Sequence, residues 1–590
     1  MPESLFVGLV LVGSLVLFIW ERWRYDVVAM VALLTLTLTG IIPAVDAFAG
    51  FSHPAVITVA GVLVITRAMV NSGVVDVLAR WLLRVGARPG AQVVAITLLT
   101  ALCSAVMNNV AAVALLMPVG IHVARRYHFS PSRLLMPMAY ASLLGGMTTL
   151  IGTPPNIIIA LLRTQAGRPS FGMFDFSPVG VGVAAAGIVV MLLFSRWLLP
   201  DRKRQLTSEE MFHISDYLTE VRLLPKSKWV GKQLREIPPL ANGDVIVAGI
   251  IRNEQRSLAP SGLIYLEAGD ILIVQADAAT IKEMVDGDNL ELVGSKGLDE
   301  RILRSNEVGL VEAVVTPGSP MVLRTVRDLD LRRRFGINLL AVARQGADLH
   351  NRLGDVHFAA GDVVLLQGPN ESLTEALPGL GCLPLAGRNL RLGQPRRLWF
   401  TTSVFAGAIV AATAGLVPIE VAIATAATIL VIFGLVPLRE LYTSIEWPVI
   451  VLLGAMIPVA DALETTGGTT WIAEQFYGLA GQSSAVLALA VVLAAAMILT
   501  PLLNNAAAAL LIAPLAISIA HRFGVSPDPF LMATAVGVSC DFLTPIGHQS
   551  NTLVMGPGGY RFGDYWRLGL PVEIIVYIVT IPLVLFFWPL

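Results

Sequence analysis

Long apolar stretches and short polar segments alternate along this chain, in two groups separated by a polar middle. An α-helix needs about 20 apolar residues to cross the hydrocarbon core of a bilayer. The pattern therefore predicts a polytopic all-α membrane protein in two halves, and composition agrees, since 55% of residues are hydrophobic and only 14% charged. The predicted spans are 4–20, 27–45, 55–78, 132–163 and 178–199, then 398–416, 418–436, 447–463, 528–556 and 570–589.

Two further apolar segments, about 91–124 and about 484–520, are too long for one span and carry an asparagine pair near the middle. The pairs are Asn108-Asn109 and Asn504-Asn505. A single asparagine in a membrane helix most often bonds a neighbouring helix, but here the pair recurs in both halves. Non-helical backbone at membrane depth is tolerated only where protein or a cavity satisfies it. We predict that each segment is a re-entrant helical hairpin that turns at its asparagines.

Each hairpin is followed by an apolar segment that a polar stretch interrupts, GTPPN at 152–156 and GHQSN at 547–551. Pro118 and Arg126 recur in the second half at the same offset as the asparagine pairs. The chain therefore contains an internal duplication. Two hairpin tips and two broken helices predict one shared binding site.

Basic residues predict that the two repeats are inverted. The clusters all fall on one side if 91–124 is re-entrant, and the positive-inside rule makes that side the cytoplasm. Loop 464–482 has no Lys or Arg. We predict a multi-pass protein of the inner cell membrane with both termini outside, the plan of secondary transporters that bind substrate near the midplane. The clusters are Arg22 and Arg24; Arg80, Arg84 and Arg88; Arg125, Arg126 and Arg133; Arg202, Lys203 and Arg204; Arg396, Arg397 and Arg439; and Arg561 and Arg567.

The middle of the chain, 205–392, has frequent charges and short β-rich runs bounded by turn residues. It repeats internally, since YLEAGDILIVQ at 265–275 matches HFAAGDVVLLQ at 357–367. We predict a cytoplasmic α/β insert of two tandem small domains, 205–295 and 296–392, between membrane repeats 1–204 and 393–590.

Other functional classes find no support in the sequence. No nucleophile–base pair or metal-ligand cluster has a workable spacing, so we expect neither an enzyme nor an organic cofactor. A formal net charge of -1 gives no reason to expect nucleic acid as a partner. The insert lacks a GxGxxG motif, which argues against regulation by a nicotinamide cofactor. Arg332-Arg333-Arg334 is either a solvated face or a site for a small anionic effector such as a cyclic dinucleotide.

The run MNNVAAVALLMPV followed by GGMTTLIGTPPN resembles the divalent anion/sodium symporter family of the ion transporter superfamily. The resemblance covers both membrane halves, and the insert resembles two copies of the C-terminal ligand-binding subdomain of regulators of potassium conductance. The family's Ser-Asn-Thr triplet reads Met107-Asn108-Asn109 in the first half and Leu503-Asn504-Asn505 in the second. By analogy with the family we also expect a homodimer.

This resemblance implies two sodium sites and one dianion between the repeats. Sodium would be held by Asn108 with the backbone of Gly152, and by Asn504 with the backbone of Gly547. The side chains implied to face the substrate are Asn109, Thr153, Asn505 and His548.

Elementary chemistry agrees with a sodium and anion site. Sodium prefers hard oxygen ligands, and amide oxygens and unwound carbonyls supply them without a fixed negative charge. Half-helices that begin at Asn109, Asn505, Asn156 and Asn551 would aim N–H groups and positive dipole ends at an anion. The sequence thus predicts sodium-driven uptake of a divalent oxyanion, with sulfate first and a dicarboxylate second.

Asp541 leaves other mechanisms open. It lies seven residues before His548, a spacing that puts the two side chains on roughly the same helix face. An acid inside a span suggests a coupling role, while the structural alternative is a carboxylate bonded to nearby backbone. With a histidine nearby, proton coupling and an exchanger or arsenite-type permease of the same superfamily remain possible. A ligand-gated anion channel, gated by the insert, is the alternative from another class.

Overall fold

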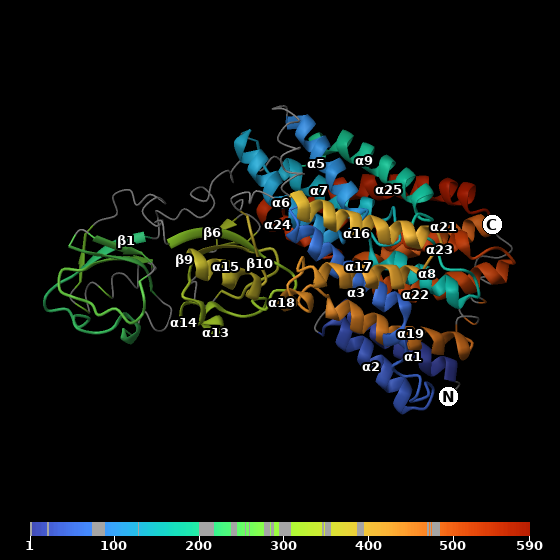
Figure 1. Ribbon diagram of the computed structural model, residues 1–590, viewed down its shortest axis with the longest axis horizontal. Helices are drawn as coiled ribbons and strands as arrows, with labels where there is room; N and C mark the ends of the chain where they lie inside the picture. The colour runs from blue at the N-terminus through green and yellow to red at the C-terminus, as the bar shows by residue number, and fades with distance from the viewer. Residues whose placement is uncertain are drawn as a thin grey trace.

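The computed structural model is mostly helical, with two small β-sheets at one end of the molecule (Figure 1). Six helices in the described part are long and apolar enough to cross a membrane, and shorter apolar helices accompany them. The predicted all-α membrane protein with a β-containing insert is therefore confirmed. The structure describes residues 3–590 except 21–22, 74–88, 128, 200–217, 238–244, 254, 259, 276–283, 285–287, 289, 294–307, 345–346, 349–355, 386–394, 469–470, 472–473 and 475–483.

The helices follow the apolar pattern in both halves, with a break where each polar stretch interrupts it. Members of the predicted basic clusters that lie outside the described residues are Arg22, Arg80, Arg84, Arg88, Arg202, Lys203 and Arg204. The first half contains α1 (Glu3–Trp20), α2 (Tyr25–Leu38), η1 (Ala49–Ser52), α3 (Pro54–Asn71), α5 (Pro89–Ser104), α6 (Asn109–Arg126), α7 (Ser132–Gly146), α8 (Pro154–Gln165) and α9 (Ser177–Leu198). The second half contains α16 (Pro395–Thr413), α17 (Ile419–Ile432), α18 (Leu438–Leu441), α19 (Trp447–Thr465), α21 (Ala485–Leu499), η6 (Thr500–Leu502), α22 (Asn505–Phe523), α23 (Asp528–Gly537), α24 (Gln549–Gly558), η7 (Phe562–Asp564) and α25 (Tyr565–Phe587).

The second part of each broken helix, α8 or α24, packs against the hairpin of the other half. The hairpin of α5 and α6 packs on α7 of its own half and on α24 of the other half, while α21 and α22 pack on α23 and on α8. A second group of helices forms through the pairs α2 with α19, α3 with α17 and α16 with α17. Each hairpin tip therefore meets elements of both repeats.

Two contacts join the repeats. An ion pair lies at the end of α8, and a buried phenol lies just after α24. Arg163 in α8 forms a two-pronged ion pair with Asp528 at the start of α23, with nitrogen–oxygen distances of 2.8 and 2.9 Å. Arg168 adds a third contact to Asp528 at 2.8 Å. Tyr560, which is fully buried, donates to the carbonyl of Ser132 and accepts from the backbone of α7. These contacts fix the two broken helices against each other.

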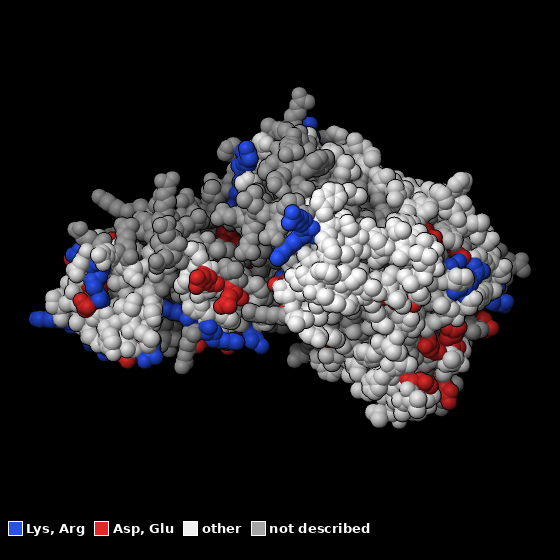
Figure 2. Space-filling model, in the orientation of Figure 1, with Lys and Arg blue, Asp and Glu red and all other residues white. Residues whose placement is uncertain are grey.

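Beyond the exposed Arg396 and Arg397 at the start of α16, the face formed by α16 and α17 is free of charge in Figure 2. Its exposed side chains are large and apolar, which a water-facing surface rarely presents over so wide an area. This face fits the hydrocarbon of a bilayer. Examples are Trp399, Val410, Val421, Ile432 and Phe433.

The insert consists of two antiparallel five-stranded sheets, with orders β3-β2-β4-β1-β5 and β10-β6-β9-β7-β8. The matching sequence repeats place matching ion pairs in them, Arg252 with Asp270 and Arg344 with Asp362. Each aspartate also accepts a backbone N–H and fixes the turn before its strand. The strands are β1 (Leu218–Leu223), β2 (Ile246–Arg252), β3 (Gln255–Leu258), β4 (Ile271–Gln275), β5 (Leu290–Leu292), β6 (Val308–Val315), β7 (Asn338–Arg344), β8 (Ala347–Asp348), β9 (Val363–Pro369) and β10 (Cys382–Pro384), with helices α13 (Val326–Leu329), α14 (Leu331–Phe335) and α15 (Asn370–Gly379).

The second sheet packs directly on the membrane helices. Arg125 at the end of α6 donates to Glu312 of β6 at 2.8 Å, and Gly361 lies against the backbone of Gly556 in α24. Gly361 has φ +86, and a Cβ there would lie 2.9 Å from the carbonyl of Thr552, so the turn requires glycine. Hydrophobic residues of β6 and β9, such as Val363, belong to the core of the membrane helices.

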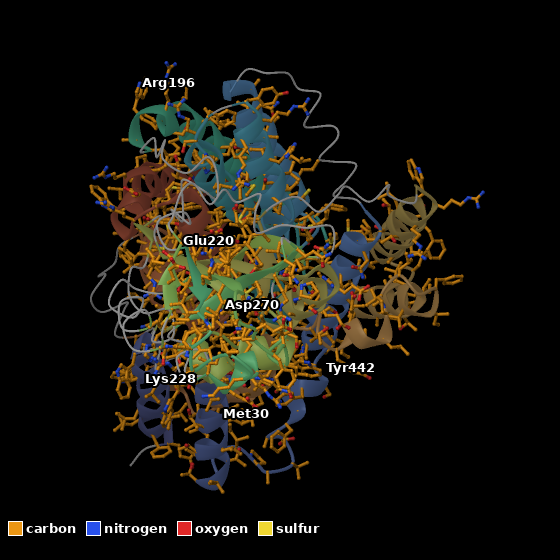
Figure 3. All side chains as sticks on the ribbon, turned by 90° about the vertical axis from the view of Figure 1, so that its left-hand side faces the viewer. Met30, Arg196, Glu220, Lys228, Asp270 and Tyr442 are labelled. Carbon is orange, nitrogen blue, oxygen red and sulfur yellow. The ribbon has the colours of Figure 1, made fainter. Side chains whose placement is uncertain are left out.

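The first sheet lies farther from the membrane helices, at the far end of the insert (Figure 1). Figure 3 views the molecule from that end, with Glu220, Lys228 and Asp270 labelled in front of the helices. The chain termini lie at the end away from the insert (Figure 1). Which end faces the cytoplasm stays a prediction.

Candidate functional site

The first asparagine of each pair ends the hairpin tip and starts the next helix. Asn108 Oδ1 accepts a hydrogen bond from the N–H of Val110 at 2.9 Å, and Asn504 Oδ1 accepts one from Ala506 at 3.0 Å. An asparagine at this position satisfies an N–H group that has no partner inside the helix. As expected, α6 and α22 therefore begin at the second asparagine of each pair, Asn109 and Asn505.

Oxygen atoms surround the buried amide of Asn109. They are Ser104 Oγ at 2.7 Å, the carbonyl of Ser142 at 3.1 Å and the carbonyl of Gly152 at 3.2 Å. Because the two carbonyls can only accept, the amide nitrogen points to this side and donates. The first tip thus contacts the break of its own repeat through Asn109 and Gly152, two of the predicted site residues.

The breaks of the two repeats have nearly the same conformation. Thr153 precedes α8 with φ -145 and ψ 141, and His548 precedes α24 with φ -139 and ψ 141. The ring of His548 accepts the N–H of Ser550 at Nδ1, 3.0 Å away, so the neutral ring carries its proton on Nε2. The half-helices begin at Pro154 and Gln549, two residues earlier than predicted.

Asn156 and Asn551 occupy equivalent positions in the two repeats and make equivalent hydrogen bonds. Asn156 Nδ2 donates to the carbonyls of Thr149 at 2.8 Å and Gly146 at 3.4 Å. Asn551 Nδ2 bonds the carbonyls seven and ten residues before it, at 3.1 and 2.6 Å. Both side-chain oxygens are buried, without a hydrogen-bond partner among the described residues. Each break therefore holds an amide oxygen that a cation or a donor of the substrate could use.

Asp541 is fully buried at the second break. The expectation that it shares a helix face with His548 is wrong, because α23 ends at Gly537 and the chain up to His548 is not helical. Its neighbours belong to the second hairpin tip, where Thr500 and Asn505 face the carboxylate. The irregular backbone thus brings Asp541 to the tip.

Sequence reasoning missed two contacts of the tips. Glu446, which precedes α19, accepts a hydrogen bond from Asn108 Nδ2 at 3.2 Å. An acid at the end of a span is common, so nothing in the sequence singled it out. The second missed contact is Ser104. It could have been found, because Thr500 stands at the equivalent position of the second repeat, with the same spacing that relates the two asparagine pairs.

A separate cavity of about 370 Å³ lies near η1, at the end of α8 and along α19. Its polar lining includes Asp46, His53 and Asp461, and Gln165 donates to Asp461 at 2.9 Å. In the described part of the chain, no predicted site residue lines this cavity. The side chains of Asn109, Asn156 and Asn551 are instead 2%, 1% and 0% exposed.

The arginine run of the insert faces more than solvent. Arg332 in α14 donates to the carbonyl of Pro260 at 2.9 Å. Its side chain is partly buried there, and the burial lowers the pKa of its guanidinium. Arg334 is exposed, and basic residues gather around α13 and α14 (Figure 2). At least one member of the predicted effector cluster therefore ties the two sheets together.

Comparison with known proteins identifies the family. The family model described as citrate transporter (CitMHS) matches residues 15–537 and 495–590. This chain belongs to the citrate transporter family. That family lies in the divalent anion/sodium symporter superfamily, so the resemblance seen in the membrane halves is confirmed. The resemblance of the insert to regulator subdomains stays a prediction. Its members are transporters, which confirms that the protein is not an enzyme.

Several relatives match over the whole chain or half of it. The chain is 31% identical to the uncharacterized transporter sll0640 of Synechocystis sp., over 97% of this chain and 95% of that protein. It is 30% identical to the uncharacterized transporter YfbS of Escherichia coli, over 100% and 99%. Sodium/sulfate cotransporter 1 of Chlamydomonas reinhardtii is 29% identical over 57% of this chain and 40% of that protein. The solved YdaH transporter of Alcanivorax borkumensis aligns with a TM-score of 0.44 at 14% identity, over 100% of this chain and 99% of that one.

Proposed function

We propose that this protein is a secondary transporter that couples uptake of a divalent oxyanion, with sulfate as first candidate, to sodium. The mirrored amide oxygens of Asn156 and Asn551, buried without protein partners at the two breaks, carry the proposal. They supply hard neutral ligands in duplicate, as a site for cations and one anion between two repeats requires. Relatives named sodium/sulfate cotransporters in Chlamydomonas reinhardtii support the choice of ion and substrate.

In the proposed site, each sodium ion lies between a hairpin tip and the facing break. Asn108 and the Gly152 backbone hold one ion. Asn504 and the Gly547 backbone hold the other. The Oδ1 of each first asparagine caps a helix with one lone pair and keeps the other for the ion, while backbone carbonyls provide further oxygens.

The anion lies between the two tips in this proposal. Its donors are the side chain of Asn505, Thr153 and the Nε2–H of His548. Asn109, whose amide nitrogen bonds the carbonyls of Ser142 and Gly152, shapes the first tip on the substrate side. The starts of α6, α8, α22 and α24 add N–H groups and positive dipole ends. This arrangement balances an oxyanion without a lysine or arginine at the tips.

A second candidate substrate is a carboxylate such as citrate or a dicarboxylate, which the description of the matching family favours. Sulfate is a compact tetrahedron, whereas a carboxylate substrate is longer and presents separate charged groups. Competition between the two classes decides which one the site accepts.

Transport would proceed by alternating access. In our proposal the hairpins and broken helices, joined by Arg163, Asp528 and Tyr560, move as one body against the group that contains α3, α17 and α19. The insert lies in the cytoplasm and, through its contacts with α6 and α24, regulates that movement in response to a small anionic effector. The protein forms a homodimer in the inner membrane, with both termini outside.

The test is uptake of labelled sulfate into proteoliposomes under an inward sodium gradient, with a potassium-only control. Sodium-dependent accumulation that excess succinate and citrate do not reduce supports the sulfate symporter. Competition by either carboxylate, with its own uptake, assigns the second candidate. Accumulation driven by a pH gradient alone refutes sodium coupling in favour of protons, and simple equilibration without accumulation refutes a transporter in favour of a channel.

A further inference from the structure

The two hairpin tips carry similar polar residues, but at one neighbouring position the repeats differ in charge. In the first repeat Ser104 and Asn109 lie beside Gly146, and in the second Thr500 and Asn505 lie beside Asp541. The hydrogen bonds of Asn156 and Asn551 identify Gly146 and Asp541 as equivalent, since each asparagine bonds the carbonyl ten residues before it. A glycine in one site is thus a buried acid in the other.

No side chain fits at the glycine position of the first tip. A Cβ on Gly146 would collide with the side-chain amide of Asn109. In the second repeat the tip leaves room for a carboxylate at this point, next to Asn505. The difference therefore changes the shape of the tip as well as its charge.

The carboxylate of Asp541 has nothing to balance its charge in the described part of the chain. Its side chain is 0% exposed, and neither oxygen has a hydrogen-bond partner there. Glu573 of α25 adds repulsion. Burying a charge without a partner is costly. A cation beside Asp541 would balance this charge, and the alternative is that the carboxyl group takes up a proton.

The surroundings of Asp541 are oxygen-rich and otherwise neutral. A Cβ on Gly547 would lie 3.3 Å from Asp541 Oδ1 and 3.1 Å from Thr544 Oγ1, so both oxygens line the same side of the break. Asn551 Oδ1 is buried without a partner among the described residues. One carboxylate with hydroxyl, amide and carbonyl oxygens suits a monovalent hard cation.

A divalent metal is less suited to this set. Calcium and magnesium sites usually draw on several carboxylates or retained waters, and the described residues contain no group of three or more acidic, histidine or cysteine side chains that could hold a metal. Sodium, with its single charge, matches the single carboxylate.

We propose that Asp541 is a direct ligand of a sodium ion at the second hairpin tip, so that the two cation sites are unequal. This inference rests on the proposed function and deepens it. The first tip has glycine where the second tip has Asp541, and the acid near it, Glu446, is bonded to Asn108 Nδ2. The second tip becomes neutral only when sodium is bound, and while empty its carboxylate repels the anion. Sodium at the second tip must therefore bind before the anion does.

The test is equilibrium binding of ²²Na⁺ to the purified full-length protein without any anion substrate. The wild type is expected to bind two ions per chain. Asp541→Asn, which keeps the shape but removes the charge, is expected to lose one of them or to bind it at least 10-fold more weakly. Glu573→Gln removes a neighbouring buried acid and is the matched control, which should keep both ions. Asp541→Glu restores the charge and should recover the second ion at least in part.

The two proposals fail in different ways in this experiment. If Asp541→Asn binds two ions as tightly as wild type, the carboxylate is not a ligand, and sodium-coupled uptake is untouched. If the wild type binds sodium as predicted but moves no sulfate, the substrate is wrong and the ligand assignment stands. If Asp541→Asn does not give a monodisperse protein, Asp541→Ser, with space for water, takes its place with the same expected loss. A wild type that binds no sodium overturns both proposals.

Discussion

The ion pair between α8 and α23 offers a quantitative test of how the repeats are joined. The side chains of Arg163 and Asp528 are only 13% and 9% exposed, whereas Arg168, which also contacts Asp528, is 39% exposed. Asp528→Asn keeps the size of the side chain but leaves the guanidinium of Arg163 buried without a counter-charge. Removing one partner of a buried pair costs about 3–5 kcal/mol.

The exposed arginine should matter much less. A solvent-exposed ion pair contributes about 0–1 kcal/mol, so we expect Arg168→Met to cost no more than that. The destabilisation by Arg163→Met should lie between those of the other two variants. Asp528 keeps Arg168 as a partner, but the change also removes the contact of Arg163 with the ring of Phe171, 4.3 Å away. Such a cation–π contact adds about 0.5–2 kcal/mol. The predicted order of destabilisation is therefore Asp528→Asn, then Arg163→Met, then Arg168→Met.

The assay is unfolding of the purified protein in detergent, compared across the three single variants. The double variant Arg163→Met with Asp528→Leu replaces the pair by apolar side chains and should cost less than Asp528→Asn alone, because no buried charge is left unpaired. Equal losses for Asp528→Asn and Arg168→Met would refute the reasoning, since burial would then not set the energy of the pair.

Three further predictions concern the tips and the joints between parts. Asn109→Ala and Asn505→Ala should each abolish uptake while the protein stays folded, as judged by size-exclusion chromatography, and near-normal uptake by either one contradicts the role of that tip. Glu312→Gln removes the counter-charge of Arg125 and should make the insert more accessible to limited proteolysis at low salt, with unchanged cleavage arguing against this joint. Tyr560→Phe leaves a buried backbone group of α7 without its partner and should destabilise the protein by about 1–3 kcal/mol; a neutral effect in the unfolding assay would show that water or another group replaces the phenol.

Much of the fold could be predicted because its signals are local. Apolar length marks the spans, and the asparagine pairs and Gly-containing stretches mark the points where helices must turn or break, since a buried amide or an unwound backbone has few other places in a membrane. These signals located the tips at Asn109 and Asn505 correctly. They misplaced the helix starts near Asn156 and Asn551 by two residues, because Pro154 is already suited to a first helical turn.

The arrangement around Asp541 could not be predicted in the same way. Helical spacing suggested a shared face with His548, but the chain between them is irregular, and in such a segment the backbone path decides where each side chain points. Only the folded chain shows that the acid reaches Asn505 at the second tip while its counterpart, Gly146, touches Asn109.

The amino-acid sequence by itself determined the duplication, the two hairpins, the two breaks and the polar insert, because each depends on hydrophobicity and turn chemistry within a short window. The tertiary structure alone decided the exchange of α8 and α24 between the repeats and the pairing of Arg163 with Asp528, which are 365 residues apart. Apolar helices of similar length can pack on one another in many ways, so their pattern does not state which neighbour each will have. Close packing and the pairing of buried charges select that neighbour.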